Sequence, residues 1–396
     1  MLSVLYVVDV DQYFGSPNEL LVLLKAFQKQ NQIRPVVLTA ISGPLNKRLN
    51  NLGIENHVIG RVGWYVGTDR KWKKLVKRLA TPFFYCIFKY QLFAAIRHSA
   101  AVVDFSKIDL IHTNVSINPL GAYLAAKYHL PHIWHLRETF TTSNLFFTVP
   151  GHAIDFMRSH ANRFVAISKY VANSWQTLGL PADKICQIAD GIDSVRITDV
   201  DRKHPSTADL KIVQIGSISD FKGQVRLIRA LALLPEKVRK NFQVDFIGDG
   251  DSSYINQLKS LITQEKMADI CHFRGYVANA MTHLQDYQVG IVSSPEGFGL
   301  TTVEYMMAGL IVVAENSGAN GELISDGHNG ILYSAGSVSD LAMKLNFLVE
   351  QPEKMRNLAY RATKESVSRY DINKTASEIL TLYADLLSDK EKRQNK

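Results

Sequence analysis

The chain has 396 residues, of which 46% are hydrophobic and 21% are charged, which excludes a disordered protein and predicts two domains of about 150–200 residues each. Its three cysteines, Cys86, Cys186 and Cys271, lie far apart without metal-ligand spacing, which excludes a disulfide framework or a structural zinc site and favours a reducing compartment. The formal net charge is +8, but no nucleic-acid recognition motif accompanies it, so we expect no nucleic-acid partner.

The first half of the chain alternates short apolar runs with longer helical patterns, which is typical of a parallel sheet covered by helices. Its first run, residues 1–9, lacks the basic start and the length of a signal peptide, so we expect a buried strand of a cytoplasmic protein. The strands predicted in this half are Ser3–Val8, Arg34–Leu38, Glu55–Ile59, Asp109–His112, His132–His135, Arg163–Ile167 and Lys184–Ile188.

A basic segment, residues 70–98, contains eight lysines or arginines and no acidic residue. Apolar residues recur in it at helical spacing up to Leu79, and an aromatic run follows Pro82. This composition is typical of a helix that lies peripherally on an anionic membrane surface, but also of a helix that packs its apolar side on the domain core. Both interpretations stay open. The uncharged stretches around Lys89 are shorter than the ~20 residues of a spanning helix.

A second series of apolar runs follows the polar stretch Arg196–Asp209. We therefore predict the α/β class, with two doubly wound domains, residues 1–195 and 196–370, that face a central cleft. The last helix, Ile372–Leu387, carries an apolar stripe, and we expect residues 371–396 to return to the first domain. The strands predicted for the second domain are Lys211–Ile215, Gln243–Ile247, Ile270–Phe273, Gln288–Val292, Ile311–Val313 and Gly330–Tyr333.

Two glutamates eight positions apart, Glu296 and Glu304, flank a predicted strand-to-helix junction in the sequence EGFGLTTVE. Gly297 and Gly299 allow the backbone to approach a ligand, and the free N–H groups at the start of the following helix can hold a phosphate. The two carboxylates can accept hydrogen bonds from sugar hydroxyls. The alternative is a polar loop with a capping carboxylate, which by itself contributes about 0.3–1 kcal/mol to stability.

Further polar or glycine-containing loops follow other predicted strands. Because the carboxyl ends of parallel strands lie at one edge of a sheet, residues in these loops are expected to meet there. In the second domain, Lys222 can reach a bound phosphate, while Gly216 and Gly248 permit a close approach of the backbone. In the first domain, His135 ends a predicted strand, and His112, also near a strand end, is interpreted as a structural histidine. These positions favour the ligand site over the capping loop.

Read in order, the segments GSISDFKGQ, FIGDG, FRGYV, EGFGLTTVE and SGANGELISDGHNGILY resemble the C-terminal half of the retaining glycosyltransferases of family 4, which have the two-domain GT-B fold. The resemblance is close over Lys211–Tyr333 and looser in the N-terminal half. It implies a sugar transfer from a nucleotide-diphosphate sugar, the donor substrate, with no cofactor and no metal ion.

Matched residue by residue, the resemblance implies a role for each residue of a donor site. Glu304 would hold the ribose hydroxyls, Glu296 would hold those of the donor sugar, and Lys222 would hold the diphosphate. His135 would approach the sugar from the N-terminal domain, so that Glu296, His135 and Lys222 form the catalytic set. The other donor-binding residues would be Gly15, Gly216, Gly248, Tyr276, Val277, Gly297, Phe298, Gly299, Leu300 and Thr301.

The chain departs from the family pattern at two positions. Ser217 stands where the family usually has a phosphate-binding arginine, and a single Gly15 stands where a glycine pair is common. If no other cation substitutes for the arginine, the loss of one charge-assisted hydrogen bond would weaken donor binding roughly 10- to 150-fold. Arg226 and Arg274 are the candidate substitutes.

The sequence thus favours a cytoplasmic hexosyltransferase that extends a polysaccharide or a lipid-linked glycan acceptor. A peripheral position on the inner face of the membrane is one of the two open interpretations of the basic segment. Two alternatives stay open: a catalytically silent GT-B subunit that binds a partner transferase or the membrane, and a nucleotide-sugar epimerase. Nucleotide binding without turnover would favour the silent subunit, and conversion of the donor without an acceptor would favour the epimerase. The intact pair of glutamates favours the transferase.

Overall fold

A computed structural model describes residues 1–9, 15–67, 81–139, 145–147, 150–193, 210–278 and 280–394 of the chain. The chain divides into two compact units. Unit 1 comprises Met1–Gly191 and Ile372–Lys396, and unit 2 comprises Ile192–Asp371. The predicted domain boundary at residues 195 and 196 lies outside the described residues and stays a prediction.

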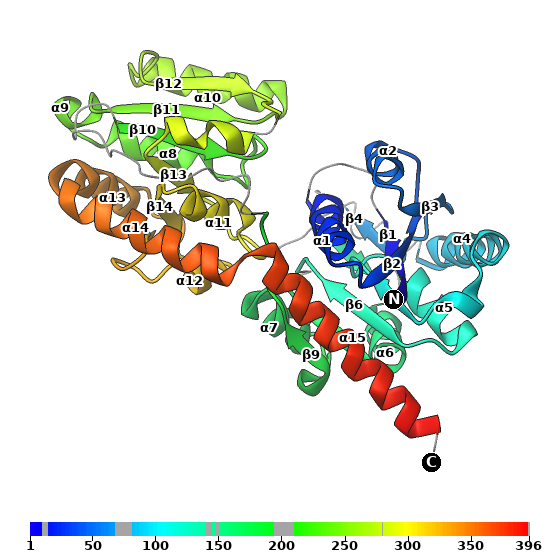
Figure 1. The fold of residues 1–396 in the computed structure, drawn as a ribbon. Coiled ribbons are helices and arrows are strands. Elements are labelled where there is room, and N and C mark those ends of the chain that lie inside the picture. Colours follow the sequence, from blue (N-terminus) through cyan, green and yellow to red (C-terminus); the bar gives the residue numbers. More distant parts are fainter. Residues whose placement is uncertain are drawn as a thin grey trace. The chain divides into compact units, whose positions relative to one another are not determined.

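Unit 1 contains a seven-stranded parallel sheet with the strand order β3-β2-β1-β5-β6-β8-β9 (Figure 1). Every strand predicted in this half is confirmed, with ends that differ by at most one residue. The strands are β1 (Leu2–Val8), β2 (Ile33–Thr39), β3 (Glu55–Val58), β5 (Leu110–Thr113), β6 (His132–Leu136), β8 (Arg163–Ala166) and β9 (Ile185–Gln187). The sequence patterns do not predict a separate antiparallel pair, β4 (Tyr65–Gly67) and β7 (Leu145–Phe147).

The helices of unit 1 include the last helix of the chain, as its apolar stripe predicts. Alternate residues of β1, such as Val4 and Tyr6, point into a core that also contains Ile379 and Tyr383 of this helix. The helices are α1 (Ser16–Gln30), α2 (Pro44–Asn51), α4 (Thr81–Val102), α5 (Leu120–Tyr128), α6 (Pro150–His160), α7 (Lys169–Thr177) and α15 (Ile372–Gln394), with short 3-10 helices at Phe105–Lys107 and Ala182–Lys184.

Unit 2 contains a six-stranded parallel sheet with the order β12-β11-β10-β13-β14-β15. All six strands predicted for this half are confirmed, with ends that differ by at most two residues. They are β10 (Leu210–Ile215), β11 (Phe242–Ile247), β12 (Cys271–Gly275), β13 (Val289–Val292), β14 (Ile311–Glu315) and β15 (Ile331–Tyr333). Two parallel sheets with covering helices confirm the predicted α/β class.

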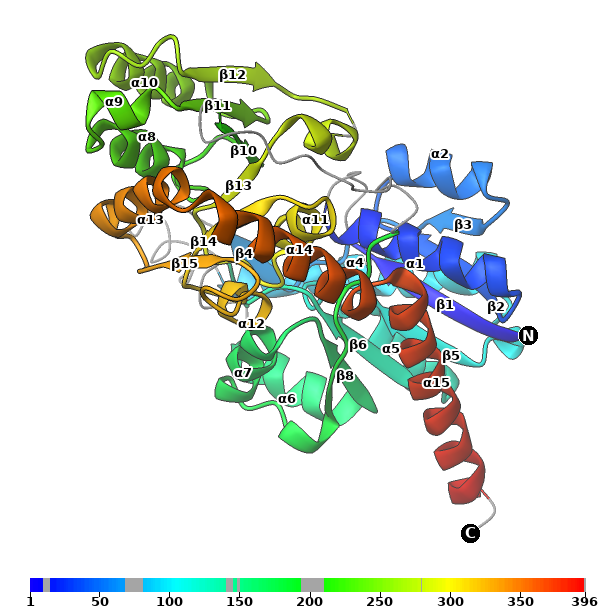
Figure 2. The ribbon, with the colours of Figure 1, turned by 60° about the vertical axis from the view of Figure 1, so that its left-hand side comes forward.

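The helices of unit 2 cover both faces of its sheet. Apolar residues of α8, α10 and α13 share one core with alternate residues of the strands, and Figure 2 shows α8, α9 and α10 gathered on one side of β10 and β11. On the other face, the ring of Tyr305 from α11 lies against Gly290. The helices are α8 (Gln224–Ala232), α9 (Glu236–Arg239), α10 (Ser252–Gln264), α11 (Leu300–Met307), α12 (Asn320–Leu323), α13 (Val338–Glu350) and α14 (Pro352–Arg369), with a 3-10 helix at Ala280–Asp286.

The basic segment is described only in part. Residues 70–80 lie outside the described residues, and the segment from residue 81 onward belongs to α4. This helix buries Phe88, whose ring contacts Tyr123 of α5. The large aromatic side chains that α4 exposes are Phe83, Tyr90 and Phe93, at 65%, 75% and 67% of their surface. Packing on the core does not explain these three rings, which we call the α4 aromatic stripe. Across the part of the chain that the structure describes, no helix combines the length and the apolar character needed to cross a bilayer.

Candidate functional site

The loops that follow β10 and β11 approach each other closely in unit 2. The N–H of Gly216 donates to the carbonyl oxygen of Ile247 at 3.0 Å, and the N–H of Gly248 donates to that of Gly275 at 2.8 Å. Gly248 has a φ of 145°, and a Cβ added there would lie 2.0 Å from the carbonyl oxygen of Gly216. Only glycine fits such a position. The two glycines predicted for the site therefore form one stretch of bare backbone at the carboxyl edge of the sheet.

Lys222 lies in the loop between β10 and α8, and two glutamines hold this loop. The side-chain amide of Gln214 donates to the carbonyl oxygen of Lys222 at 2.8 Å, and that of Gln224 donates to the carbonyl oxygen of Ser217 at 3.0 Å. The carbonyl of the Gln224 side chain also accepts from the N–H of Ser219. Both glutamines are buried. The backbone from which the Lys222 side chain extends is therefore fixed by contacts beneath it.

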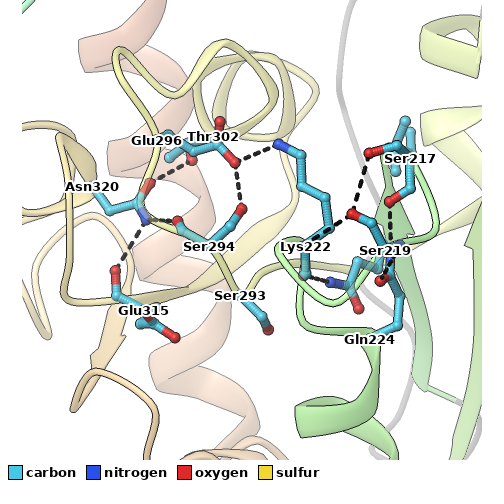
Figure 3. A network of polar contacts seen from close by, with 12 residues as sticks. Ser217, Ser219, Lys222, Gln224, Ser293, Ser294, Glu296, Thr302, Glu315 and Asn320 are labelled. Carbon is cyan, nitrogen blue, oxygen red and sulfur yellow. Dashed lines mark hydrogen bonds and ion pairs between the residues drawn. The ribbon is translucent and has the colours of Figure 1, made fainter. Parts of the chain in front are cut away.

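Lys222 and Glu296 form an ion pair in which Nζ lies 2.6 Å from Oε1 (Figure 3). The hydroxyl of Ser294 donates to the same carboxylate oxygen. The two charged side chains keep 26% and 20% of their surface exposed, so that solvent and solutes reach both. An ammonium group binds anions, and a carboxylate accepts hydrogen bonds from hydroxyls. The structure therefore places an anion-binding group beside a hydroxyl-binding group.

The backbone of Glu296 is held by the segment that follows β14. Glu296 pairs with Gly318 in an isolated parallel bridge, and the N–H of Ala319 donates to the carbonyl oxygen of Glu296 at 2.8 Å. Gly318 has a φ of 59°, and a Cβ added there would lie 2.5 Å from that same oxygen. The Glu296 loop can therefore occupy this position only while residue 318 lacks a side chain.

A buried asparagine joins this loop to the neighbouring elements. The side-chain amide of Asn320 donates to the carbonyl oxygens of Ser294 and Glu315, at 3.0 Å each (Figure 3). Its side-chain carbonyl accepts a hydrogen bond from the hydroxyl of Thr302. Asn320 thus connects the loop after β13, the end of β14 and the first turn of α11, the three segments that surround Glu296.

Helix α11 starts at Leu300, directly after Gly299, as the glutamate motif predicts. Its first N–H groups have no carbonyl partner within the helix, so they can bind an anion. Thr301 lies in this first turn, Glu304 lies half-buried one turn later, and Gly297 precedes the helix in the partly exposed loop.

Phe298 contributes to this loop by packing. Its side chain is buried, and its ring meets that of Tyr370 edge-on, with the two ring centroids 5.6 Å apart. The side chain therefore stabilises the loop, while the backbone of Phe298 is the part that is left for a ligand.

The predicted base-binding residues, Tyr276 and Val277, follow β12. The N–H of Tyr276 donates to the carboxylate of Asp249 at 3.1 Å, while half of the tyrosine surface is exposed. Val277 lines a cavity of about 640 Å³ that also contains Ile247 and Arg274. An exposed ring beside a cavity is a geometry in which a planar base can stack.

The two candidate substitutes for the missing arginine at Ser217 both have carboxylate partners. Nε of Arg226 lies 3.3 Å from a carboxylate oxygen of Glu315, and Nε of Arg274 donates to Asp245 at 2.9 Å. A paired guanidinium is less available to a phosphate. Both candidate arginines are therefore engaged with carboxylates of the sheet, that of Glu315 at the end of β14 and that of Asp245 in β11.

The unit 1 residues predicted for the site lie at the carboxyl edge of its sheet. Gly15 is the exposed residue that precedes α1. His135 lies near the end of β6 with 1% of its surface exposed, and its Nδ1 is 3.1 Å from Nε2 of His112. Burial, followed by the nearby charge of Arg137, lowers the pKa of His135 well below 6.5. His135 is therefore a neutral imidazole at neutral pH.

Arg137 ties this edge of unit 1 together. Its guanidinium forms an ion pair with Asp190 at 2.5 Å, in which the two side chains expose 6% and 10% of their surface. Its Nε donates to the side-chain carbonyl of Asn114 at 3.1 Å. The segments that follow β5, β6 and β9 are joined in this way, which fixes the backbone beside His135.

The sequence patterns miss the residues that support the site. Asn320, Gln214 and Gln224 hold the loops of unit 2, and His112, interpreted as a structural residue, bonds directly to His135. The polar run after Gly318 is the signal that could have pointed to Asn320. The glutamines carry no comparable signal, because each lies in an ordinary strand or helix.

Two protein-family models match the chain in adjacent segments. The model described as Glycosyl transferases group 1 matches residues 197–365, and the model described as Glycosyltransferase Family 4 matches residues 45–196. The first match contains the Lys222–Glu296 ion pair, and the second contains His135.

Full-length relatives and solved structures agree with these matches. The N-acetyl-alpha-D-glucosaminyl L-malate synthase of Bacillus anthracis is 23% identical over 364 residues, which cover 87% of this chain and 93% of the relative. The alpha-monoglucosyldiacylglycerol synthase of Acholeplasma laidlawii is 25% identical over 325 residues, 73% of this chain and 78% of the relative. The crystal structure of Anabaena HepE in complex with UDP has a TM-score of 0.76 at 20% identity and covers 97% of this chain and 100% of HepE, which shows a shared fold.

Proposed function

The chain belongs to glycosyltransferase family 4 and has the GT-B fold, and we propose that it is a retaining hexosyltransferase that uses a nucleotide-diphosphate sugar as donor. The proposed acceptor is a polysaccharide or a lipid-linked glycan precursor. HepE was crystallised with UDP and with UDP-glucose, which supports a nucleotide sugar as the donor. The Acholeplasma relative is named as a synthase of a glucosylated diacylglycerol, which supports a lipid-linked acceptor.

The Lys222–Glu296 ion pair is the observation that carries this proposal. An ammonium group has three donor hydrogens, so Lys222 can keep one hydrogen bond to Glu296 and direct the others to a diphosphate. The second oxygen of the Glu296 carboxylate can then accept from hydroxyls of the donor sugar. The first N–H groups of α11 would share the charge of the diphosphate, and Glu304 would hold the ribose. His135 would bind the sugar from unit 1.

The reaction that follows needs positive groups at the leaving diphosphate. The bond between the anomeric carbon and the diphosphate oxygen breaks, and the leaving oxygen takes both bonding electrons. The acceptor hydroxyl oxygen forms the new bond on the same face of the sugar, and its proton passes to the departing phosphate. Lys222 and the start of α11 stabilise the charge that develops on the diphosphate, so in this proposal no metal ion is required.

A donor screen tests the proposed function. We expect the purified chain to release nucleoside diphosphate from one of a set of UDP-, GDP-, ADP- and dTDP-sugars when a lipid-linked acceptor is present, and NMR of the product to show the anomeric configuration of the donor. A Glu296→Ala variant should lose most of this turnover. Glu353→Ala is the matched control, because the Glu353 side chain is 80% exposed in the same unit.

Three outcomes of this screen would contradict the proposal. An inverted anomeric configuration in the product would contradict the retaining mechanism. Conversion of the donor sugar without any acceptor would favour an epimerase. Nucleotide binding without turnover across all donors and acceptors would favour a silent GT-B subunit. Ser217 is the reason to test for one, because it stands where the family usually has a phosphate-binding arginine.

We further propose that α4 attaches the enzyme to an anionic membrane surface. The α4 aromatic stripe exposes three rings of the kind that enter the interface of a bilayer, and the basic part of the segment precedes it in sequence. Such a position would bring a lipid-linked acceptor to unit 1. Nearby lysines and arginines would add electrostatic attraction that salt weakens.

A triple variant, Phe83→Ser, Tyr90→Ser and Phe93→Ser, is expected to weaken binding to vesicles that contain anionic lipid by at least about tenfold. The reason is that burying an aromatic side chain contributes roughly 1.5–3 kcal/mol when it is complete, and even partial insertion of three rings exceeds the 1.4 kcal/mol of a tenfold change. Vesicle sedimentation measures the affinity. The control removes two exposed apolar residues of unit 2, Met343→Ser and Tyr360→Ser, and should bind like the wild type. Equal affinities for both variants would refute the role of α4.

A further inference from the structure

A chain of four buried polar side chains in unit 1 ends at His135. The hydroxyls of Tyr6 and Tyr383 lie 3.1 Å apart, the Tyr383 hydroxyl lies 2.6 Å from Nδ1 of His112, and Nε2 of His112 lies 3.1 Å from Nδ1 of His135. Each of the four residues exposes at most 1% of its surface. Within the described residues, Nε2 of His135 has no hydrogen-bond partner. A buried nitrogen left unpaired is destabilising, which points to a ligand that pairs with it.

Three neighbouring strands and the last helix place these side chains together. Tyr6 of β1 and His112 of β5 are direct partners in the register of the sheet, and β6, which carries His135, pairs with β5. Tyr383 reaches them from α15, whose residues Ile379 and Leu386 pack into the same core. The end of the chain is therefore connected, through two hydrogen bonds, to the histidine predicted for the site.

Burial keeps all four groups uncharged at neutral pH. Desolvation is the main reason that the pKa of His112 falls to about 3 and that the pKa of His135 lies well below 6.5, with the charge of Arg137 as the second cause in both. Desolvation also raises the pKa of Tyr6 and of Tyr383 above the ordinary value of 10. Each tyrosine therefore carries one O–H proton, and each imidazole carries one N–H proton.

These protons can satisfy the three hydrogen bonds with either tautomer of His135. In the first arrangement Tyr6 donates to Tyr383, Tyr383 donates to Nδ1 of His112, and Nε2–H of His112 donates to Nδ1 of His135, whose own proton is on Nε2. With the second tautomer the proton of His135 is on Nδ1, His112 donates to the Tyr383 hydroxyl, and the hydroxyl proton of either Tyr6 or Tyr383 needs another acceptor. Among the described residues, the hydrogen bonds of these two hydroxyls all lie within the chain itself. The second tautomer therefore leaves a buried donor unpaired.

We propose that Tyr383 and His112 are positioning residues that hold His135 as the Nε2–H tautomer, so that His135 presents a neutral hydrogen-bond donor to its ligand. The ligand must then offer a lone pair, as the hydroxyl or ring oxygen of a sugar does. The assignment of that oxygen to the donor sugar rests on the proposed function. A neutral N–H group also avoids the repulsion that an imidazolium would exert on the positive charge developing at the anomeric carbon.

NMR of the full chain labelled with ¹⁵N in its histidine side chains tests the tautomer without any substrate. We expect His135, assigned by the signals that disappear in a His135→Gln variant, to be protonated at Nε2 and unprotonated at Nδ1. In Tyr383→Phe the donor to His112 is lost, so a measurable share of His135 should carry its proton on Nδ1. In that variant kcat should fall about tenfold, the equivalent of one hydrogen bond, while KM for the donor changes little.

Tyr6→Phe is the matched control, because it removes the same atom from the same buried chain. The first arrangement survives in this variant, since Tyr383 can still donate to His112, so the His135 signals should stay as in the wild type. Wild-type His135 protonated at Nδ1, or unchanged His135 signals in Tyr383→Phe, would overturn the proposal. If Tyr383→Phe does not fold, the wild-type spectrum alone decides between the two tautomers. If the tautomers behave as expected but no nucleotide sugar turns over, the proposed function fails and the positioning role stands.

Discussion

Replacement of Lys222 by methionine is expected to lower kcat by about 10²- to 10³-fold with the nucleotide sugar that the chain uses. The leaving diphosphate gains negative charge as its bond to the anomeric carbon breaks, and the loss of one preorganised donor to such a charge costs about 2.7–4 kcal/mol. Methionine keeps an unbranched stem, and the loop beneath it stays held by Gln214 and Gln224. Release of nucleoside diphosphate at saturating donor and acceptor measures the effect.

Lys240→Met is the control for the lost charge. Nζ of Lys240 also lies 2.6 Å from a glutamate, Glu236, in the same unit, but these two side chains expose 66% and 67% of their surface. This variant should keep kcat within about twofold of the wild type, because an exposed pair contributes little. Equal losses in the two variants would contradict a specific role for Lys222. A large loss of stability in Lys222→Met would give the lysine a structural role, since a partly exposed pair should contribute no more than about 1 kcal/mol.

A Gly318→Ala substitution is expected to lower the free energy of unfolding of unit 2 by roughly 2–5 kcal/mol. At a φ of 59° the left-handed conformation costs alanine about 1–2 kcal/mol. The added Cβ would also lie 2.5–2.8 Å from backbone atoms of Pro295 and Glu296, and such overpacking costs about 1–3 kcal/mol more. The backbone that must move carries Glu296, and a displacement of about 1 Å at a reacting centre can lower the rate about 10²-fold. Denaturant titration by circular dichroism and a turnover assay measure the two effects.

Gly327→Ala is the control that separates the cost of the left-handed backbone conformation from the cost of the steric contact with Glu296. Gly327 lies in the same unit at a φ of 72°, and no atom lies within 4 Å of its added Cβ. This control should lose only the cost of the left-handed conformation, about 1–2 kcal/mol, and should keep its turnover. Similar stability and turnover in the two variants would mean that Gly318 does not hold the Glu296 loop.

Most of the strands could be predicted from the sequence because they are short apolar runs buried on both faces, as in β13. The pair β4 and β7 was missed because these two short strands pair with each other instead of joining the main sheet, and no local pattern reveals a partner so far away in the sequence. Lys222 and Glu296 could be predicted as members of one site because both follow strands. Their contact at 2.6 Å depends on β10 and β13 being neighbours in the sheet, which no local pattern reveals.

The supporting residues could not be predicted because their roles depend on distant partners. Tyr383 occupies an apolar position of an amphipathic helix, and the pattern explains it completely as a core residue. Its hydrogen bond to His112 joins residues 271 positions apart. The role of Asn320 likewise depends on the folded structure, because its hydrogen-bond partners lie after β13, at the end of β14 and in α11. Sequence patterns report which residues are buried, and they do not report which buried polar groups meet.

The return of α15 to unit 1 sets an order for folding during synthesis. Unit 2 is one continuous stretch, Ile192–Asp371, so the ribosome has produced all of it before α15 is made. Unit 1 waits longer, because Ile379 and Tyr383 of its core are translated after all of unit 2. Until then, the sheet face that carries Tyr6 and His112 has no cover from α15. A nascent chain can therefore complete its second unit while its first is unfinished, and the hydrogen bond between Tyr383 and His112 forms only after α15 has been made.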